Sequence, residues 1–112
     1  MIPTLLNNYR SLALADTGVV VAAQKSLLCG WCITNTNAAI RFVKLYNKAT
    51  AASAADTPVL VIGIPPGATE NGSVPGGLLF SAGISARGVT TLADAGATGN
   101  AAGEVATQLF YQ

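Results

Sequence analysis

The chain has 112 residues, of which 10% are charged and 51% are apolar, and its net charge is +1. This length suits one domain with its own core, the small net charge excludes strong attraction to nucleic acid, and no apolar run approaches the ~20 residues of a membrane helix. Because ordinary proteins are about 25% charged, we expect a largely neutral surface, part of which is covered in an assembly.

We assign residues 1–16 to an N-terminal arm and residues 17–112 to a β-sandwich domain. Residues 4–15 have a loose amphipathic pattern that fits either a short helix or an extended arm lying on a neighbouring molecule. No basic residue precedes the first apolar stretch, so we expect no cleaved signal peptide and synthesis in the cytoplasm. The arm contributes four candidate interface residues, namely Leu5, Leu6, Tyr9 and Arg10.

Seven short runs rich in β-branched and aromatic residues follow, each bounded by turn residues. They cover residues 17–24, 25–34, 39–46, 58–64, 77–85, 87–92 and 104–111. Helical periodicity is poor throughout, and in the alanine-rich segment 49–55 Thr50 and Ser53 favour a loop over a helical turn. The sequence therefore predicts an all-β fold, an antiparallel, jelly-roll-like β-sandwich of seven to eight strands.

The run 25–34 contains Cys29-Gly30-Trp31-Cys32. A redox pair with this spacing places its first thiolate at the start of a helix, whereas a strand points Cys29 and Cys32 to opposite faces and keeps the two sulfur atoms apart. We therefore interpret both cysteines as structural thiols, with a redox pair as the minor alternative. Trp31 is expected to anchor the core between two sheets or at a subunit seam.

Two cations lie in the run 39–46. Arg41 and Lys44 fall on opposite faces of this strand, so at least one of them must lie at an edge, a rim or an intersubunit contact. We expect both charges to be exposed and include both among the candidate interface residues.

The run 58–64 is apolar on both faces, which predicts a central strand or one that faces another subunit. Residues 65–77 follow with three prolines and four glycines, which predicts a long loop with a tight turn at Asn71-Gly72. Because long loops in compact domains are often contact surfaces, this segment adds Pro65, Pro66 and Asn71 to the candidate interface residues.

The charges are divided unevenly along the chain. Residues 1–48 hold five basic residues against one acidic residue, a net +4, and residues 49–112 hold one basic against four acidic, a net −3. If the halves face different sides of the fold, this polarity aligns subunits. If strands from the two halves interleave, as sandwich topologies usually require, the charges average out.

No catalytic or cofactor chemistry stands out. The chain has no histidine and two cysteines, too few ligands for a zinc site within one chain, although cysteines of several subunits can meet around a symmetry axis. The five carboxylates are far apart in sequence and no phosphate-binding glycine motif occurs. We expect a protein that is not an enzyme and that holds no cofactor or metal.

Several motifs carry a resemblance to a known family. They are Gly30-Trp31, Asn35-Thr36-Asn37-Ala38-Ala39, Phe42-Val43-Lys44-Leu45-Tyr46-Asn47, Thr57-Pro58, Ile64-Pro65-Pro66-Gly67, Gly77-Leu78-Leu79-Phe80 and Gly83-Ile84. Over residues 18–111 the chain resembles small virion proteins of tailed bacteriophages, and most closely a capsid decoration (cement) protein. The motifs mark strands and turns rather than reactive residues.

The resemblance implies a structural protein on the capsid surface of the virion, made in the host cytoplasm. Its partners would be the major capsid protein, whose neighbouring subunits it bridges, and further copies of itself in a homotrimer, with no nucleic acid and no membrane. The runner-up interpretation is a phage tail or adhesin-type module that contacts host glycan through the 65–77 segment or an aromatic platform. A neutral Thr, Ser and Asn surface that simply faces water is the alternative to a surface covered in an assembly.

Overall fold

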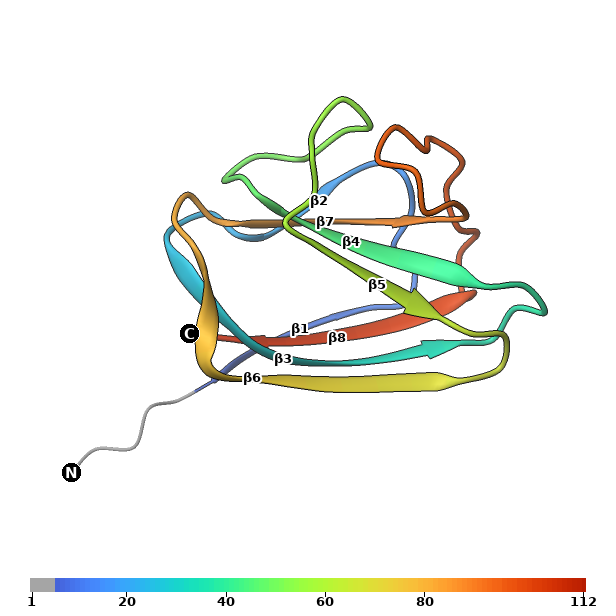
Figure 1. Cartoon of the computed structure of the whole chain (residues 1–112), viewed down its shortest axis with the longest axis horizontal. Helices are drawn as coiled ribbons and strands as arrows, with labels where there is room; N and C mark the ends of the chain where they lie inside the picture. Colours follow the sequence, from blue (N-terminus) through green and yellow to red (C-terminus); the bar gives the residue numbers. More distant parts are fainter. Residues whose placement is uncertain (1–5) are drawn as a thin grey trace.

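The computed structural model describes residues 6–112 and is all-β, as the sequence predicts. Its eight strands are β1 (Asn7–Ser11), β2 (Val19–Ala22), β3 (Ser26–Asn35), β4 (Arg41–Asn47), β5 (Leu60–Ile64), β6 (Thr69–Phe80), β7 (Ile84–Val89) and β8 (Val105–Tyr111). They form two layers that pack face to face (Figure 1). Among residues 6–112, no helix has the length and apolar character needed to cross a bilayer.

The strand pairing is that of a jelly roll. β1 pairs with β8, β2 with β7, β3 with β6 and β4 with β5, always antiparallel, so the pairs are nested like one long hairpin rolled up. Contacts between β3 and β8 and between β4 and β7 then join the pairs into two four-stranded sheets. Sheet A has the order β1-β8-β3-β6 and sheet B the order β2-β7-β4-β5.

The core lies between the two sheets, where every second residue of the central strands points inward. Leu28 and Ile33 of β3 and Leu109 of β8 meet Leu45 of β4 and Ile84 of β7, all with no exposed surface. Trp31 is half-buried and packs against this cluster from sheet A. This agrees with its predicted place between two sheets.

The first strand corrects the predicted arm. Asn7–Ser11 pairs with β8 of the same chain, Asn7 opposite Tyr111, and Leu14 is 2% exposed in the core. Residues 7–16 therefore belong to the sandwich rather than to an arm on a neighbour, and the segment is extended rather than helical. Tyr9 and Leu14 face the core while Leu6 and Leu12 do not, so the apolar residues of this segment do not share the single face that an amphipathic helix needs.

The predicted loop over residues 65–77 is also wrong, because most of it lies in β6. Leu28 pairs with Leu78 and Gly30 with Ser73, so one residue of β3 faces residues 74–77 of β6 in a wide bulge. The bulge accommodates Pro75 and the positive φ angles of Gly76 and Gly77, 81° and 84°. Proline is tolerated because β6 is an edge strand.

The tight turn lies earlier than predicted. Ala68 N donates to Pro65 O at 3.2 Å, and Gly67 has a φ of 66°, which closes the connection from β5 to β6. Asn71 and Gly72 instead pair with Cys32 and Trp31 inside the ladder. The strand predicted over 87–92 starts earlier too, because the turn after β6 lies at residues 81–83.

β5 is an edge strand of sheet B, not the predicted central strand. Its inward residues Ile62 and Ile64 enter the core, while Val61 is half-buried and Val59, just before the strand, is 47% exposed. The second apolar face of this segment therefore lies on the outside of the molecule.

Candidate functional site

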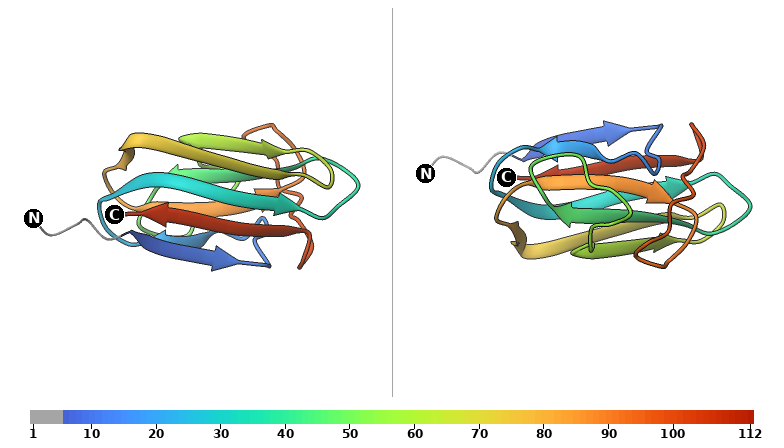
Figure 2. Two further views of the ribbon diagram at one scale, coloured as in Figure 1. Left: turned by 90° about the horizontal axis from the view of Figure 1, so that it is seen from below. Right: turned by 90° about the horizontal axis from the view of Figure 1, so that it is seen from above.

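The two outer faces of the sandwich differ. Viewed from below, the four strands of sheet A lie bare, whereas from above the connections around residues 48–59 and 90–104 cross sheet B (Figure 2). Lys44 Nζ donates to Ala93 O, which shows that the second connection rests on β4. A broad partner therefore has free access to sheet A.

The bare face carries neutral side chains. One row across the sheet runs from Arg10 through Gln108 and Cys32 to Asn71. The residues that alternate with the core positions of sheet A and so project from this face are Asn8, Arg10, Leu27, Gly30, Cys32, Thr34, Thr69, Asn71, Ser73, Leu79, Ala106, Gln108 and Phe110. Arg10 is the one charged residue among these thirteen, all of them in the described part of the chain.

The candidate interface residues from the predicted arm lie in different environments in the structure. Arg10 is exposed on the bare face, and Leu6 is exposed next to β1. Tyr9 points the other way and packs against the core. Leu5 lies outside the described residues. Arg10 shares the face with Asn71, but the two sit on opposite edge strands, β1 and β6.

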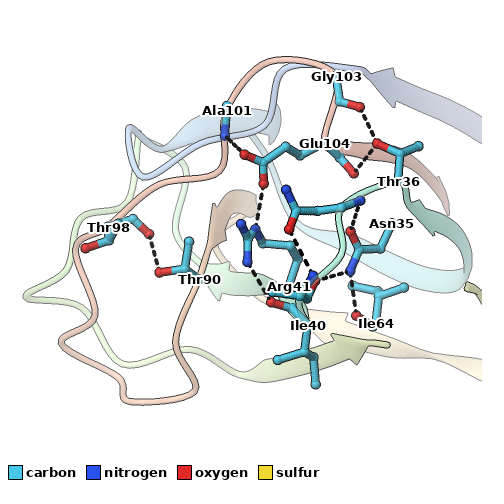
Figure 3. Close-up of polar contacts among 12 residues, drawn as sticks. Asn35, Thr36, Ile40, Arg41, Ile64, Thr90, Thr98, Ala101, Gly103 and Glu104 are labelled. Atoms are coloured by element: carbon cyan, nitrogen blue, oxygen red, sulfur yellow. Dashed lines mark hydrogen bonds and ion pairs between the residues drawn. The ribbon is translucent and has the colours of Figure 1, made fainter. Parts of the chain in front are cut away.

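The Asn-rich turn between β3 and β4 is tied to the end of β5 (Figure 3). Asn35 Nδ2 donates to Ala39 O and to Ile64 O, both at 2.9 Å, and Asn35 Oδ1 accepts a bond from Asn37 N at 2.8 Å. Pro65 O accepts a further, longer bond from Asn35 at 3.3 Å. Pro65 and Pro66 are exposed in the turn beside it, so both remain accessible at this end of the sandwich.

Arg41 does not present a free charge there. Its Nε donates to Glu104 Oε2 at 2.6 Å, and Glu104 Oε1 accepts a bond from Ala101 N at 3.0 Å (Figure 3). The hydrogen bond from Arg41, followed by that from Ala101, lowers the pKa of Glu104. Arg41 thus joins the start of β4 to the start of β8, and its predicted exposure is wrong.

A second ion pair closes the connection before β5. Lys48 Nζ donates to Asp56 Oδ2 at 3.0 Å, and the same oxygen accepts a bond from Ser53 N at 2.9 Å. The backbone bond from Ser53, followed by the bond from Lys48, lowers the pKa of Asp56. Four of the chain's charged residues are therefore used within the fold.

Among the candidate interface residues, Lys44 differs most clearly from its predicted exposure. It has no exposed surface and lies under the 90–104 connection, next to Arg87, its partner on β7. Arg87 is buried too and donates to Asp16 O at 2.7 Å, Gly96 O at 3.0 Å and Tyr46 Oη at 3.0 Å. Burial and then the charge of Arg87 lower the pKa of Lys44, and Asp94 opposes them. These cations fasten loops and are not a docking surface.

The cysteines lie on β3 as free, half-buried thiols, so the helix start that a redox pair requires is missing. Cys32 is on the bare face, and Cys29 lies at the bulge, where its Sγ donates to Leu27 O at 3.6 Å. Within residues 6–112, no group of three or more His, Cys, Asp or Glu residues is placed to hold a metal ion.

An open cavity of about 350 Å³ lies where the start of β1, the end of β2 and the end of β8 meet. Its lining is neutral, with the amides of Asn7, Gln24 and Gln112 around Tyr111, whose hydroxyl donates to Val21 O at 3.2 Å. This cavity has no titratable side chain besides that phenol, so it offers hydrogen bonds rather than acid–base chemistry.

An apolar strip lies on the outside of β4 and β5, and the sequence indicated only its β5 part. Ile40 is 44% exposed, and it lies with Phe42 over Gly63, where an added Cβ would come 3.8 Å and 3.3 Å from their side chains. Val59 and Val61 continue the strip along β5. The signal was the second apolar face of residues 58–64, which predicted a central strand or one that faces another subunit, and the edge position of β5 contradicts only the first of these.

Comparison with protein-family models, curated proteins and solved structures gave no match. Function is therefore argued from the residues, the fold and the surfaces above.

Proposed function

We propose that this protein is a non-enzymatic structural protein of a tailed-phage particle, located on the outside of the capsid. It binds the major capsid protein and stabilises the shell by bridging neighbouring subunits. The motifs in its strands and turns, which resemble those of small phage virion proteins, support the phage assignment. The bare, nearly uncharged face of sheet A supports the bridging role.

The carrying observation is that thirteen residues project from this four-stranded face and that one of them, Arg10, is charged. Pressing a flat, neutral surface against a protein lattice desolvates few charges, so burial is not opposed by the large cost of removing ions from water. Amide and hydroxyl groups such as Gln108, Asn71 and Thr34 supply the polar contacts of a stable interface. An interface of standard size, about 1,600 Å² in total, is within reach of such a sheet.

The proposal is tested by mixing the purified protein with empty shells of the capsid protein from the same phage and measuring co-sedimentation. We expect binding, and a rise in the temperature at which the shells come apart. Thr34→Glu, on a central strand of the bare face between the uncharged Ala106 and Thr69, should weaken binding about 10-fold by burying an unpaired charge. Thr57→Glu, an exposed change before β5, is the matched control and should bind normally.

If the wild-type protein does not bind these shells, the capsid role is wrong. If Thr34→Glu and Thr57→Glu bind equally well, the capsid role stands but sheet A is not the docking face. These experiments do not test the homotrimer, which stays a prediction. A measurement of native mass can check it.

A host-glycan module is the second candidate, and the bare face again supplies the observation. Phe110 lies beside Gly30 at its centre, surrounded by the amides and hydroxyls of Asn8, Gln108 and Ser73, a combination that suits stacking and hydrogen bonding to a sugar. Residues 65–77 lie mostly in β6, so they do not offer this candidate the loop that the sequence predicts. A glycan array that gives binding, together with no binding to shells, would favour the module.

A further inference from the structure

Edge strands invite pairing with another chain, because every second residue leaves its N–H and C=O unpaired. The sandwich has four of them, β1 and β6 in sheet A and β2 and β5 in sheet B. β6 is interrupted by Pro75 and its bulge, β2 has four residues and a register shift, and β1 carries Arg10. β5 has none of these protections, since its sequence LVIGI holds no charge and no proline.

The apolar strip adds exposed hydrophobic surface beside the β5 edge, on the outside of the sheet. Phe42 and Ile40 lie over Gly63 near the end of β5. Toward the start of the strand, Val59 is exposed and Val61 is half-buried. An uncharged edge next to exposed apolar side chains is the arrangement that natural proteins avoid unless the edge is used.

We propose that a second copy of this chain docks here, with β5 pairing antiparallel to β5 of the other copy around a two-fold axis at Val61. In that register Val59 of one copy lies opposite Gly63 of the other, on the same outer face. Gly63 has no side chain, and the atoms nearest to the space over it belong to Phe42 and Ile40, so Val59 packs beside them. The contact is made twice by symmetry and joins the two B sheets into one.

The charges near the edge agree with self-association. The start of β5 follows the Lys48–Asp56 ion pair, and its end pairs with Arg41, which is bound to Glu104. Antiparallel pairing brings the start of one β5 to the end of the other. Because each end is already neutralised within its own chain, no like charges are forced together.

A two-fold contact of this kind joins copies in pairs, whatever larger assembly they enter. It leaves the bare face of sheet A free, and it does not depend on the capsid role. The free protein should therefore have an even number of copies, and a stable trimer would favour the trimer prediction while overturning this contact.

The test is native mass by light scattering in reducing buffer, over concentrations up to about 1 mM, for the wild type and two lysine variants. Val59→Lys is a change at an exposed position that places a charge beside the other copy's Phe42, and it should weaken the dimer about 10-fold or more. Val20→Lys on β2, 41% exposed at the opposite edge of the same sheet, is the matched control and should dimerise as the wild type does. A wild-type monomer throughout, or equal effects of both variants, overturns the proposal.

A crosslink tests the register. In a Cys29→Ser, Cys32→Ser background, Val61→Cys places two thiols opposite each other across the axis, at a separation that suits a disulfide. We expect a covalent dimer on mild oxidation and none from Val20→Cys. Circular dichroism of each variant confirms folding, and a folded Val61→Cys protein that gives no more dimer than Val20→Cys overturns the β5 register.

Discussion

The indole of Trp31 rests on Gly72 of the neighbouring strand. A Cβ at this glycine would lie 2.1 Å from Trp31 Cζ2, so Gly72→Ala must push the ring out of place. We expect it to lower the free energy of unfolding by about 1–3 kcal/mol, as overpacking does. Urea unfolding followed by the fluorescence of this single tryptophan measures the loss, with the exposed neighbour Ser73→Ala as the control at within about 0.5 kcal/mol. Equal stability of the two variants would contradict the packing of Trp31 on Gly72.

Lys44 gives a prediction on pH. Its folded pKa is lowered by burial and by Arg87, and in the unfolded chain it returns to the ordinary lysine value. Between these two values the unfolded chain binds more protons than the folded one, so stability rises with pH in this window. Lys44→Met should remove that rise, as urea unfolding of both proteins from about pH 8 to 11 can show. Groups that titrate in the same range are common to both, so identical slopes would refute the role of Lys44.

Lys44 also shows why the candidate site could be predicted only in part from the sequence. The sequence placed Arg41 and Lys44 on opposite faces of one strand and expected exposed charges, because lysine and arginine are almost never fully buried. What covers Lys44 is the carbonyl of Ala93, 49 positions later in the chain. Only the tertiary fold brings that loop over β4, and no local sequence pattern near Lys44 indicates that the residue will be covered.

Leu12 and Leu14 test whether the segment after β1 belongs to the sandwich. Leu14 is 2% exposed and Leu12 48% exposed, although they are the same residue type two positions apart. Leu14→Ala should cost about 2–5 kcal/mol of unfolding free energy, and Leu12→Ala within about 0.5 kcal/mol. Chemical denaturation measures both. Small, equal losses would mean that this segment is an arm after all.

At the level of elements, local patterns predicted the strands with strong β-propensity and missed those with weak propensity. β3, β4, β5 and β8 are close to the predicted runs because Val, Ile and aromatic residues fill them. β1 and the first half of β6 are rich in Asn, Gly, Ser and charged residues, most of which propensity assigns to turns. They are strands because β8 and β3 offer them unpaired backbone groups.

The jelly-roll topology also determines how the unevenly divided charges of the two halves are distributed in space. In both sheets a strand from the first half of the sequence alternates with one from the second half, as the orders β1-β8-β3-β6 and β2-β7-β4-β5 show. The basic and acidic halves are therefore interleaved, and Arg41–Glu104 joins them directly. Interleaving is the arrangement in which the charges average out, so within residues 6–112 neither half of the sequence builds a charged pole of its own.

The nested pairing further predicts that the position of the chain ends matters little. Asn7 lies opposite Tyr111, and Figure 1 places the C-terminus beside the start of β1. A circular permutant that links Gln112 to Leu6 through a short Gly-Ser linker, and opens between the exposed Thr50 and Ala51, keeps every strand pair, because β8–β1 becomes a hairpin and β4–β5 the terminal pair. We expect it to fold with one cooperative unfolding transition and a smaller loss of stability than Leu14→Ala. Circular dichroism and Trp31 fluorescence through one denaturant series measure this, and two separate transitions would show that the two halves of the chain do not fold as one rolled unit.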